Sequence, residues 1–229
     1  MEKLYTLEHV FKKYNHYVLN DINLSINKGD IVTILGASGS GKSTLLNCLA
    51  GLETIDKGKI FFKNKRIDNL TENQLIHYRK NNLGFVFQKY NLIPNLNVIE
   101  NIELGKTNKK SFKIKELLKI VGLEEHYLKY PYQLSGGMQQ RVSIIRAIIK
   151  NPKVLFCDEP TGALDEKNGK TILKILKLIN EELKTTIIIV THNYNIALMS
   201  DVVITLNNGS IEQVIRNNYK RPISDIRWI

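Results

Sequence analysis

Cysteine is scarce in this chain of 229 residues, where only Cys48 and Cys157 occur. Both lie in apolar runs, and neither has a neighbouring cysteine or histidine at a spacing that binds zinc. The sequence therefore excludes a disulfide framework and a zinc finger. We interpret both residues as buried, reduced thiols.

Long apolar runs are absent as well. The longest, TTIIIVT at residues 185–191, has the length of a strand and falls far short of the ~20 residues that cross a bilayer. The N-terminal sequence MEKLYTLEHVFKKY has no apolar signal core, so nothing in it predicts secretion. We therefore expect any link to a membrane to pass through a partner protein.

Acidic residues are outnumbered, with 22 Asp and Glu against 33 Lys and Arg and a net charge of +11. The lysines are scattered along the chain rather than gathered into one basic tract. We interpret the excess as a solvated surface, with attraction to an anionic membrane as the alternative. No nucleic-acid partner is expected.

Short apolar strands alternate with amphipathic helices along the chain. The predicted strands cover residues 17–27, 31–35, 59–63, 85–88, 153–158, 185–191, 202–206 and 210–215. The predicted helices cover residues 44–50, 98–104, 112–121 and 136–150, and a further helix carries the apolar stripe Ile172, Ile175, Leu176, Ile179 and Leu183. This order indicates a mainly parallel sheet covered on both faces. The alternating strands near the two ends of the chain suggest an antiparallel appendage.

A glycine-rich loop follows the predicted strand 31–35 and precedes a helix. It matches the pattern GxxxxGK[ST] in the strand–loop–helix context of a phosphate-binding loop. Glycine lets the backbone turn so that successive N–H groups converge on phosphate oxygens, and the start of the helix adds its positive dipole end. Lys42 is expected to contact the β- and γ-phosphates, and the Ser43 hydroxyl to bind Mg²⁺. The predicted phosphate-binding residues are Gly36, Ala37, Ser38, Gly39, Ser40, Gly41, Lys42, Ser43 and Thr44.

Two adjacent acids, Asp158 and Glu159, stand at the end of the apolar strand 153–158. One acid can hold Mg²⁺ through water, and the next can act on the attacking water. With a phosphate-binding loop in the same chain, the pair predicts hydrolysis of a nucleoside triphosphate.

The segment LSGGMQQR, residues 134–141, lies shortly before the two-acid strand. Its serine is an N-cap residue, and its glycines open a helix. The order of these motifs resembles the ABC ATPase family, whose signature is LSGGQ, and the resemblance covers essentially the whole chain. It implies an α/β P-loop NTPase (RecA-like) core with a mainly parallel sheet, an antiparallel β subdomain and an inserted α-helical subdomain. We expect one domain over residues 1–229, with the helical subdomain at about 90–151 and a C-terminal tail at about 217–229.

The resemblance also implies roles for individual residues. Tyr14 matches the aromatic residue that stacks on adenine, although Phe11 and Tyr17 are close competitors. Gln88 matches a glutamine that senses Mg²⁺ and the attacking water. The remaining matches give the catalytic residues Glu159 (general base), His192 (γ-phosphate contact), Gln88 and Lys42, and the Mg²⁺ ligands Ser43, Gln88 and Asp158.

The family further implies a head-to-tail dimer with ATP and Mg²⁺ between two copies. The second half of each site would come from the signature segment of the other copy, with Ser135, Gly136 and Gly137. Asp165 matches the D-loop of the family and is a further expected nucleotide-binding residue. Met138, Asn193 and Ala37 depart from the usual family residues. None of these departures removes a charge or a hydrogen-bond donor that the phosphates require.

The segment GFVFQKYNLIP, residues 84–94, is similar to the MacB/LolD/FtsE-like branch of the family. Members of that branch pair with FtsX-like permeases and export peptides, drugs or lipoproteins, or transmit force. The resemblance therefore implies a peripheral protein on the cytoplasmic face of the membrane. We expect the permease to dock beside residues 88–101, on an apolar patch that includes Leu92, Ile93, Leu96 and Val98.

Three alternatives remain. An ATPase subunit of an importer would carry the same motifs, and only the NLIP segment argues against it. A soluble ATPase of this type that acts on nucleic acid would be expected to carry a long coiled coil or a second ATPase domain, and the chain shows neither pattern. A non-enzymatic regulatory subunit is disfavoured because the catalytic residues are intact.

Overall fold

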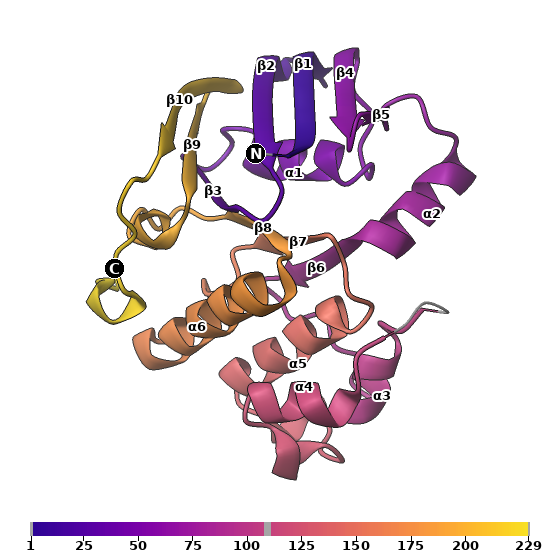
Figure 1. The fold of residues 1–229 in the computed structure, drawn as a ribbon, viewed down its shortest axis with the longest axis vertical. Coiled ribbons are helices and arrows are strands. Elements are labelled where there is room, and N and C mark those ends of the chain that lie inside the picture. The colour runs from indigo at the N-terminus through magenta and orange to yellow at the C-terminus, as the bar shows by residue number, and fades with distance from the viewer. Residues whose placement is uncertain (1, 108–110, 229) are drawn as a thin grey trace.

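The computed structural model describes residues 2–107 and 111–228, which form two β-sheets and a set of helices (Figure 1). The larger sheet has the strand order β10-β9-β3-β8-β7-β6 and the smaller sheet the order β2-β1-β4-β5. The strands are β1 (Lys3–Lys13), β2 (Tyr17–Asn27), β3 (Ile31–Leu35), β4 (Lys57–Phe62), β5 (Lys65–Arg66), β6 (Leu83–Phe87), β7 (Val154–Asp158), β8 (Thr186–Val190), β9 (Val202–Asn207) and β10 (Ser210–Arg216). The α/β architecture that the sequence predicts is confirmed.

The larger sheet is parallel across β6, β7, β8, β3 and β9. Its inner strands β3 and β8 are buried at every position, which is why their sequences are uninterrupted apolar or β-branched runs. The hairpin β9–β10 continues this sheet, because β9 pairs in parallel with β3. The predicted placement of the C-terminal strands in an antiparallel appendage is therefore wrong; only the N-terminal strands belong to the smaller sheet.

The smaller, antiparallel sheet is built around β1, which the sequence pattern did not reveal. The register of β1 against β2 shifts several times, and His9 adopts a positive φ of 49°. Each shift resets the alternation of buried and exposed residues, so the period of two is lost. An irregular strand of this kind leaves no clean periodic signal.

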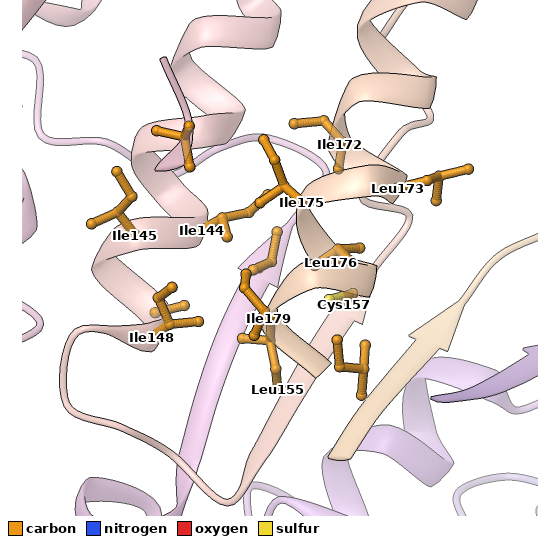
Figure 2. Close-up of a cluster of buried hydrophobic side chains, with 14 of the residues drawn as sticks. Ile144, Ile145, Ile148, Leu155, Cys157, Ile172, Leu173, Ile175, Leu176 and Ile179 are labelled. Atoms are coloured by element: carbon orange, nitrogen blue, oxygen red, sulfur yellow. The ribbon is translucent and has the colours of Figure 1, made fainter. Parts of the chain in front are cut away.

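The parallel sheet separates two apolar clusters because successive residues of a strand face opposite sides. In β7, Leu155 and Cys157 face one cluster, whereas Val154 and Phe156 face the other. Figure 2 shows the first cluster, in which two helices pack over β7. These helices are α5 (Gly136–Ile148) and α6 (Glu166–Leu183). The second cluster joins the parallel sheet to α1 (Lys42–Leu49) and to the antiparallel sheet.

The described residues between β6 and β7 are helical wherever they form regular structure. They form α3 (Val98–Glu103), α4 (Ile114–Ile120), the 3₁₀ turns η1 (Glu124–His126) and η2 (Pro131–Gln133), and α5. From within α3, the buried Asn101 side chain donates to the carbonyl oxygens of Ile93 and Leu96 in the preceding loop and accepts from the Ile93 N–H. These bonds fix the loop on which the predicted docking patch lies. Val98 is buried, so it does not belong to that patch.

Helix α2 (Glu72–Asn82) was also missed, because Tyr78 is its one buried residue. The hydroxyls of Tyr78 and Tyr5 lie 2.5 Å apart, and Tyr78 Oη donates to the carbonyl of Leu49 over 2.8 Å. This buried contact ties α2 and β1 to the end of α1. No helix in the described ranges 2–107 and 111–228 is long and apolar enough to cross a membrane.

Candidate functional site

The predicted phosphate-binding loop joins β3 to α1, which begins at Lys42, two residues earlier than predicted. Gly41 has a φ of 98°, and a Cβ there would lie 2.5 Å from the carbonyl oxygen of Val18, so this position requires glycine. The Lys42 ammonium donates to the carbonyl oxygens of Gly36 and Ala37, each over 2.8 Å. The Lys42 side chain therefore folds back over the loop, where its ammonium group is predicted to contact phosphates.

A cavity of about 360 Å³ opens beside this loop. The C-terminal ends of β7 and β8 supply its other wall, because parallel strands deliver their terminal side chains to one edge of the sheet. The structure thus brings together side chains that lie more than 150 positions apart in the chain. The lining residues are Val18, Ser38, Gly39, Gly41, Lys42, Ser43, Thr44, Asp158, Glu159, Val190 and His192.

The two predicted acids have different surroundings. Burial raises the pKa of Asp158, and the neighbouring Glu159 adds to the rise, whereas Lys42 opposes it. Glu159 is held in a left-handed backbone conformation with a φ of 48°. Its Oε2 accepts from the Thr191 hydroxyl over 3.0 Å, and its Oε1 accepts from the His192 N–H over 3.0 Å. A left-handed backbone at a residue other than glycine, with hydrogen bonds to both oxygens of its carboxylate, is typical of a functional site.

The cavity lining includes oxygen donors of the kind that the predicted Mg²⁺ requires. The described residues contain no cluster of three or more histidine, cysteine or acidic side chains that would hold a metal alone. Mg²⁺ at such sites takes one or two protein oxygens and completes its shell with phosphates and water. Ser43 and Asp158 supply a hydroxyl and a carboxylate in the same cavity, which is the donor set that this arrangement needs.

Gln88 lies outside the cavity lining but close to it. The last residue of β6, Phe87, is paired in register with Asp158, so Gln88 leaves the sheet beside Glu159. A Cβ added at Gly162 would lie 3.0 Å from Gln88 Nε2 and 3.5 Å from Glu159 Cβ. Gln88 therefore borders the loop that carries the second acid.

The predicted signature residues Ser135, Gly136 and Gly137 lie beside the predicted D-loop residue Asp165 and beside Asn168, which the sequence did not single out. These five residues are here called the signature corner. Ser135 caps α5 by accepting from the Met138 N–H, and Asp165 caps α6 by accepting from the Asn168 N–H. The two helix starts meet, because a Cβ at Gly137 would lie 2.5 Å from Asn168 Oδ1. None of these described residues lines the cavity.

The loop after β6 is fastened to α5. Arg146 donates to the carbonyl oxygens of Tyr90 and Asn91, over 2.9 and 2.6 Å. At the other end of the helix, the Tyr90 hydroxyl would lie 2.7 Å from a Cβ at Gly136. One loop thus contacts α5 at both its start and its last turn.

Tyr14 lies outside the cavity lining and is 54% exposed, with the Lys12 ammonium 5.1 Å from its ring centroid. Phe11 and Tyr17 pack edge to face nearby, with ring centroids 5.9 Å apart. The three aromatic residues remain alternatives for the adenine contact. The structure does not bring any of them into the cavity itself.

Sequence reasoning missed two kinds of residue here. Val18 and Val190 line the cavity, but their sequence signal is that of ordinary strand residues. The buried Gln140 donates to the carbonyl oxygens of Phe87 and Pro160, over 3.3 and 2.7 Å. Gln140 therefore connects α5 to the end of β6 and to the loop after β7. The one signal in the sequence that could have revealed it is a polar residue on the buried face of α5.

Comparison with known proteins is consistent with this geometry. The family described as ABC transporter matches residues 19–162. An uncharacterized ABC transporter ATP-binding protein of Methanocaldococcus jannaschii, MJ1508, is 45% identical over 86% of this chain and 90% of its own length. The macrolide export ATP-binding/permease protein MacB of Pasteurella multocida is 39% identical over 92% of this chain, but the match covers only 34% of MacB. The chain spans 67%, 46% and 61% of the length of three Mycoplasma relatives.

Among solved structures, the ATP-binding cassette MJ0796 superposes with a TM-score of 0.83 and 38% identity, over 93% of this chain and 98% of that one. That structure is described as a dimeric post-hydrolysis state bound to ADP and Pi. The chain therefore belongs to the ABC transporter family and is an ATPase cassette of that family. Its relatives include MacB, which confirms the predicted MacB-like branch.

Proposed function

We propose that two copies of the chain close head to tail around two MgATP and drive a membrane permease. The observation that carries this proposal is the separation of two half-sites within one chain. Lys42, Asp158 and Glu159 line the cavity, whereas the signature corner lies apart from it. The start of α5 presents backbone N–H groups and a positive dipole end, which suit a phosphate. A second copy, placed head to tail, brings its signature corner to the open cavity of the first.

Within each cavity we assign one task to each side chain. Lys42 binds the β- and γ-phosphates, and Ser43 with Asp158 holds the Mg²⁺ that accompanies ATP. Glu159 accepts a proton from the attacking water, and His192 contacts the γ-phosphate. Gln88 borders Glu159 and transmits changes at the phosphate site to the loop that follows β6. Catalysis of this kind rests on positioning and charge stabilisation more than on covalent chemistry.

We further propose a permease of the FtsX/MacB-like type, with this chain on the cytoplasmic face of the membrane. The similarity to MacB supports this assignment, and so does the exposed loop at Ile93 and Pro94. This loop follows Gln88 directly, so it can move when the phosphate site changes.

The variant Glu159→Gln tests the dimer and the general base together. The amide keeps the shape of the side chain but cannot take a proton, so we expect ATP turnover to fall about 100-fold or more. ATP should still bind, and the closed dimer should accumulate in size-exclusion chromatography with ATP. A variant that stays monomeric while it still hydrolyses ATP would contradict the proposal. Glu8→Gln, on β1, is the matched control and should behave as wild type.

A further inference from the structure

The C-terminal segment, residues 217–228, follows β10 and contacts two other parts of the molecule, the turn η3 (Ile196–Met199) and helix α6. It is the yellow end of the chain in Figure 1. Its first part bonds to η3 and the loop that follows, a few positions after His192. The Asn217 amide donates to the carbonyl oxygens of Ala197 and Ser200, and the Arg221 N–H donates to that of Leu198.

The second part of the segment packs on α6. Ile223 and Ile226 are buried in the apolar cluster that contains α6, at 6% and 0% exposed. The Lys170 ammonium donates to the carbonyl oxygen of Ser224 over 2.9 Å. The same ammonium lies 2.8 Å from Glu166, in the first turn of α6. The segment is thus attached to the N-terminal part of α6 by both apolar and polar contacts.

Trp228 makes the closest of these contacts. An ideal Cβ on Gly169 would lie 1.9 Å from Trp228 Cη2, so the indole ring rests directly on the backbone of α6. Gly169 lies inside a helix, where glycine weakens the helix relative to alanine. The ring approaches so closely that this position has no space for a side chain, which explains the glycine.

The position beneath the indole is next to the signature corner. Gly169 follows Asn168, whose side chain abuts Gly137 at the start of α5. Asn168 also donates to both carboxylate oxygens of Asp165, over 2.9 Å from its N–H and 2.7 Å from Nδ2. A displacement of the first turn of α6 would therefore move Asp165 and Gly137 together.

We infer that Trp228 is a positioning residue of the ATPase dimer, acting through Gly169 and Asn168 on the signature corner. The inference rests on the proposed function, because it needs that corner to complete the site of a second copy. The indole holds the start of α6 at Gly169, the residue next to Asn168, which contacts α5. Trp228 is not among the residues that line the cavity, so its loss should weaken closure of the dimer and leave nucleotide binding by one copy intact.

Variants in the Glu159→Gln background provide the test, with ATP-driven dimerisation followed by analytical ultracentrifugation. Trp228→Ala should raise the dissociation constant of the dimer at least tenfold, while affinity of the monomer for a fluorescent ATP analogue changes less than twofold. Trp228→Phe retains a ring on Gly169 and should restore dimerisation to within about threefold. Tyr219→Ala is the matched control, because Tyr219 lies in the same segment and is 75% exposed.

Gly169→Ala perturbs the same contact from the side of α6. The added methyl collides with the indole, so dimerisation should weaken as in Trp228→Ala although alanine favours the helix. Trp228 is the single tryptophan of the chain, so its fluorescence reports the displacement directly as a shift to longer wavelength. The double variant Gly169→Ala/Trp228→Ala should be no weaker than either single variant, because both changes break one contact.

Two results would overturn the inference. Dimerisation of Gly169→Ala and Trp228→Ala equal to that of Glu159→Gln alone would show that the indole does not act on the signature corner. Unchanged fluorescence of Gly169→Ala would show that the indole is not seated on α6. If Trp228→Ala does not fold, Gly169→Ala decides alone. Failure of Glu159→Gln itself to dimerise with ATP would instead refute the proposed function.

Discussion

His192 approaches Glu159 with two of its nitrogen atoms, Nδ1 at 2.8 Å from Oε1 and the backbone N–H at 3.0 Å from the same oxygen. A carboxylate only accepts hydrogen bonds, so the pairing assigns the proton of a neutral imidazole to Nδ1. Nε2 is then an acceptor, and it can donate to a phosphate oxygen only if the ring is protonated or the contact is released. The proposed base and the proposed phosphate contact are therefore coupled before any nucleotide binds.

We predict that His192→Ala lowers ATP turnover by about 10²–10³, the loss typical when one donor to a developing charge is removed. Nucleotide affinity should change little, because the phosphate-binding loop is intact. Steady-state phosphate release and equilibrium binding measure the two quantities separately. His16→Ala, at an exposed histidine between β1 and β2, should match wild type. Equal losses of binding and turnover would remove His192 from the catalytic assignment.

Lys42→Ala should abolish most of the submillimolar affinity for MgATP. Each hydrogen bond to a charged group is worth about 1.5–3 kcal/mol, so the affinity should fall between about tenfold and 100-fold. Titration with a fluorescent ATP analogue measures the loss. Lys65→Ala, an exposed lysine of β5, keeps the same net charge as the test variant and should bind normally. Undiminished binding by Lys42→Ala would contradict the assignment of the loop.

Asp158→Asn should stabilise the nucleotide-free protein at neutral pH. The pKa of Asp158 is raised chiefly by burial, so the folded state disfavours the ionised carboxylate relative to the unfolded chain. We expect the Tm to rise by roughly 2–4 °C, the shift that about 1 kcal/mol causes in a domain of this size.

The advantage of Asp158→Asn should depend on pH with a defined sign. A carboxyl whose folded pKa is raised costs stability above that pKa and costs nothing once it is protonated in both states. The difference in Tm should therefore shrink as the pH falls through the raised pKa toward the ordinary carboxyl value of 3.8. A constant or growing difference at low pH would show that the cost does not come from ionisation.

Asn91→Asp and Asn95→Asp should uncouple transport from ATP hydrolysis. Both side chains are exposed on the loop where we propose that the permease docks. A carboxylate there places an unpaired charge in the interface, while ATP binding by the isolated chain should stay unchanged. Cysteines at the same two positions should cross-link to cytoplasmic segments of the permease. A cysteine at Lys59, on β4, should not; cross-linking from Lys59 alone would place the docking surface elsewhere.

The parts of the structure that the sequence revealed are those whose signal is local. Residues 36–43 form a contiguous phosphate-binding pattern, and β7 and β8 are contiguous apolar runs. Helix α2 also carried a local signal that was overlooked, because Thr71 and Gln74 form a capping box at its start. Its low apolar content outweighed that signal.

Other features could not be read from a single sequence because they depend on tertiary contacts. The bulges of β1 erase its alternation, and the pairing of β9 with β3 joins segments that lie far apart in the chain. Val18 reaches the cavity only because β2 passes beside the phosphate-binding loop. Gln140 shows its importance only once the ends of β6 and β7 are placed beside α5.

The attachment of one loop to both ends of α5 has a mechanical consequence. The 13 residues of this helix span about 20 Å, and the loop contacts it through Tyr90 at Gly136 and through the bonds from Arg146. We therefore expect the loop and the helix to be displaced together, so that a load applied at Asn91 would be passed to the start of α5 beside Ser135. A permease that pushes on this loop would change the gap between the two copies directly, and nucleotide-driven closure would return the same displacement to the permease.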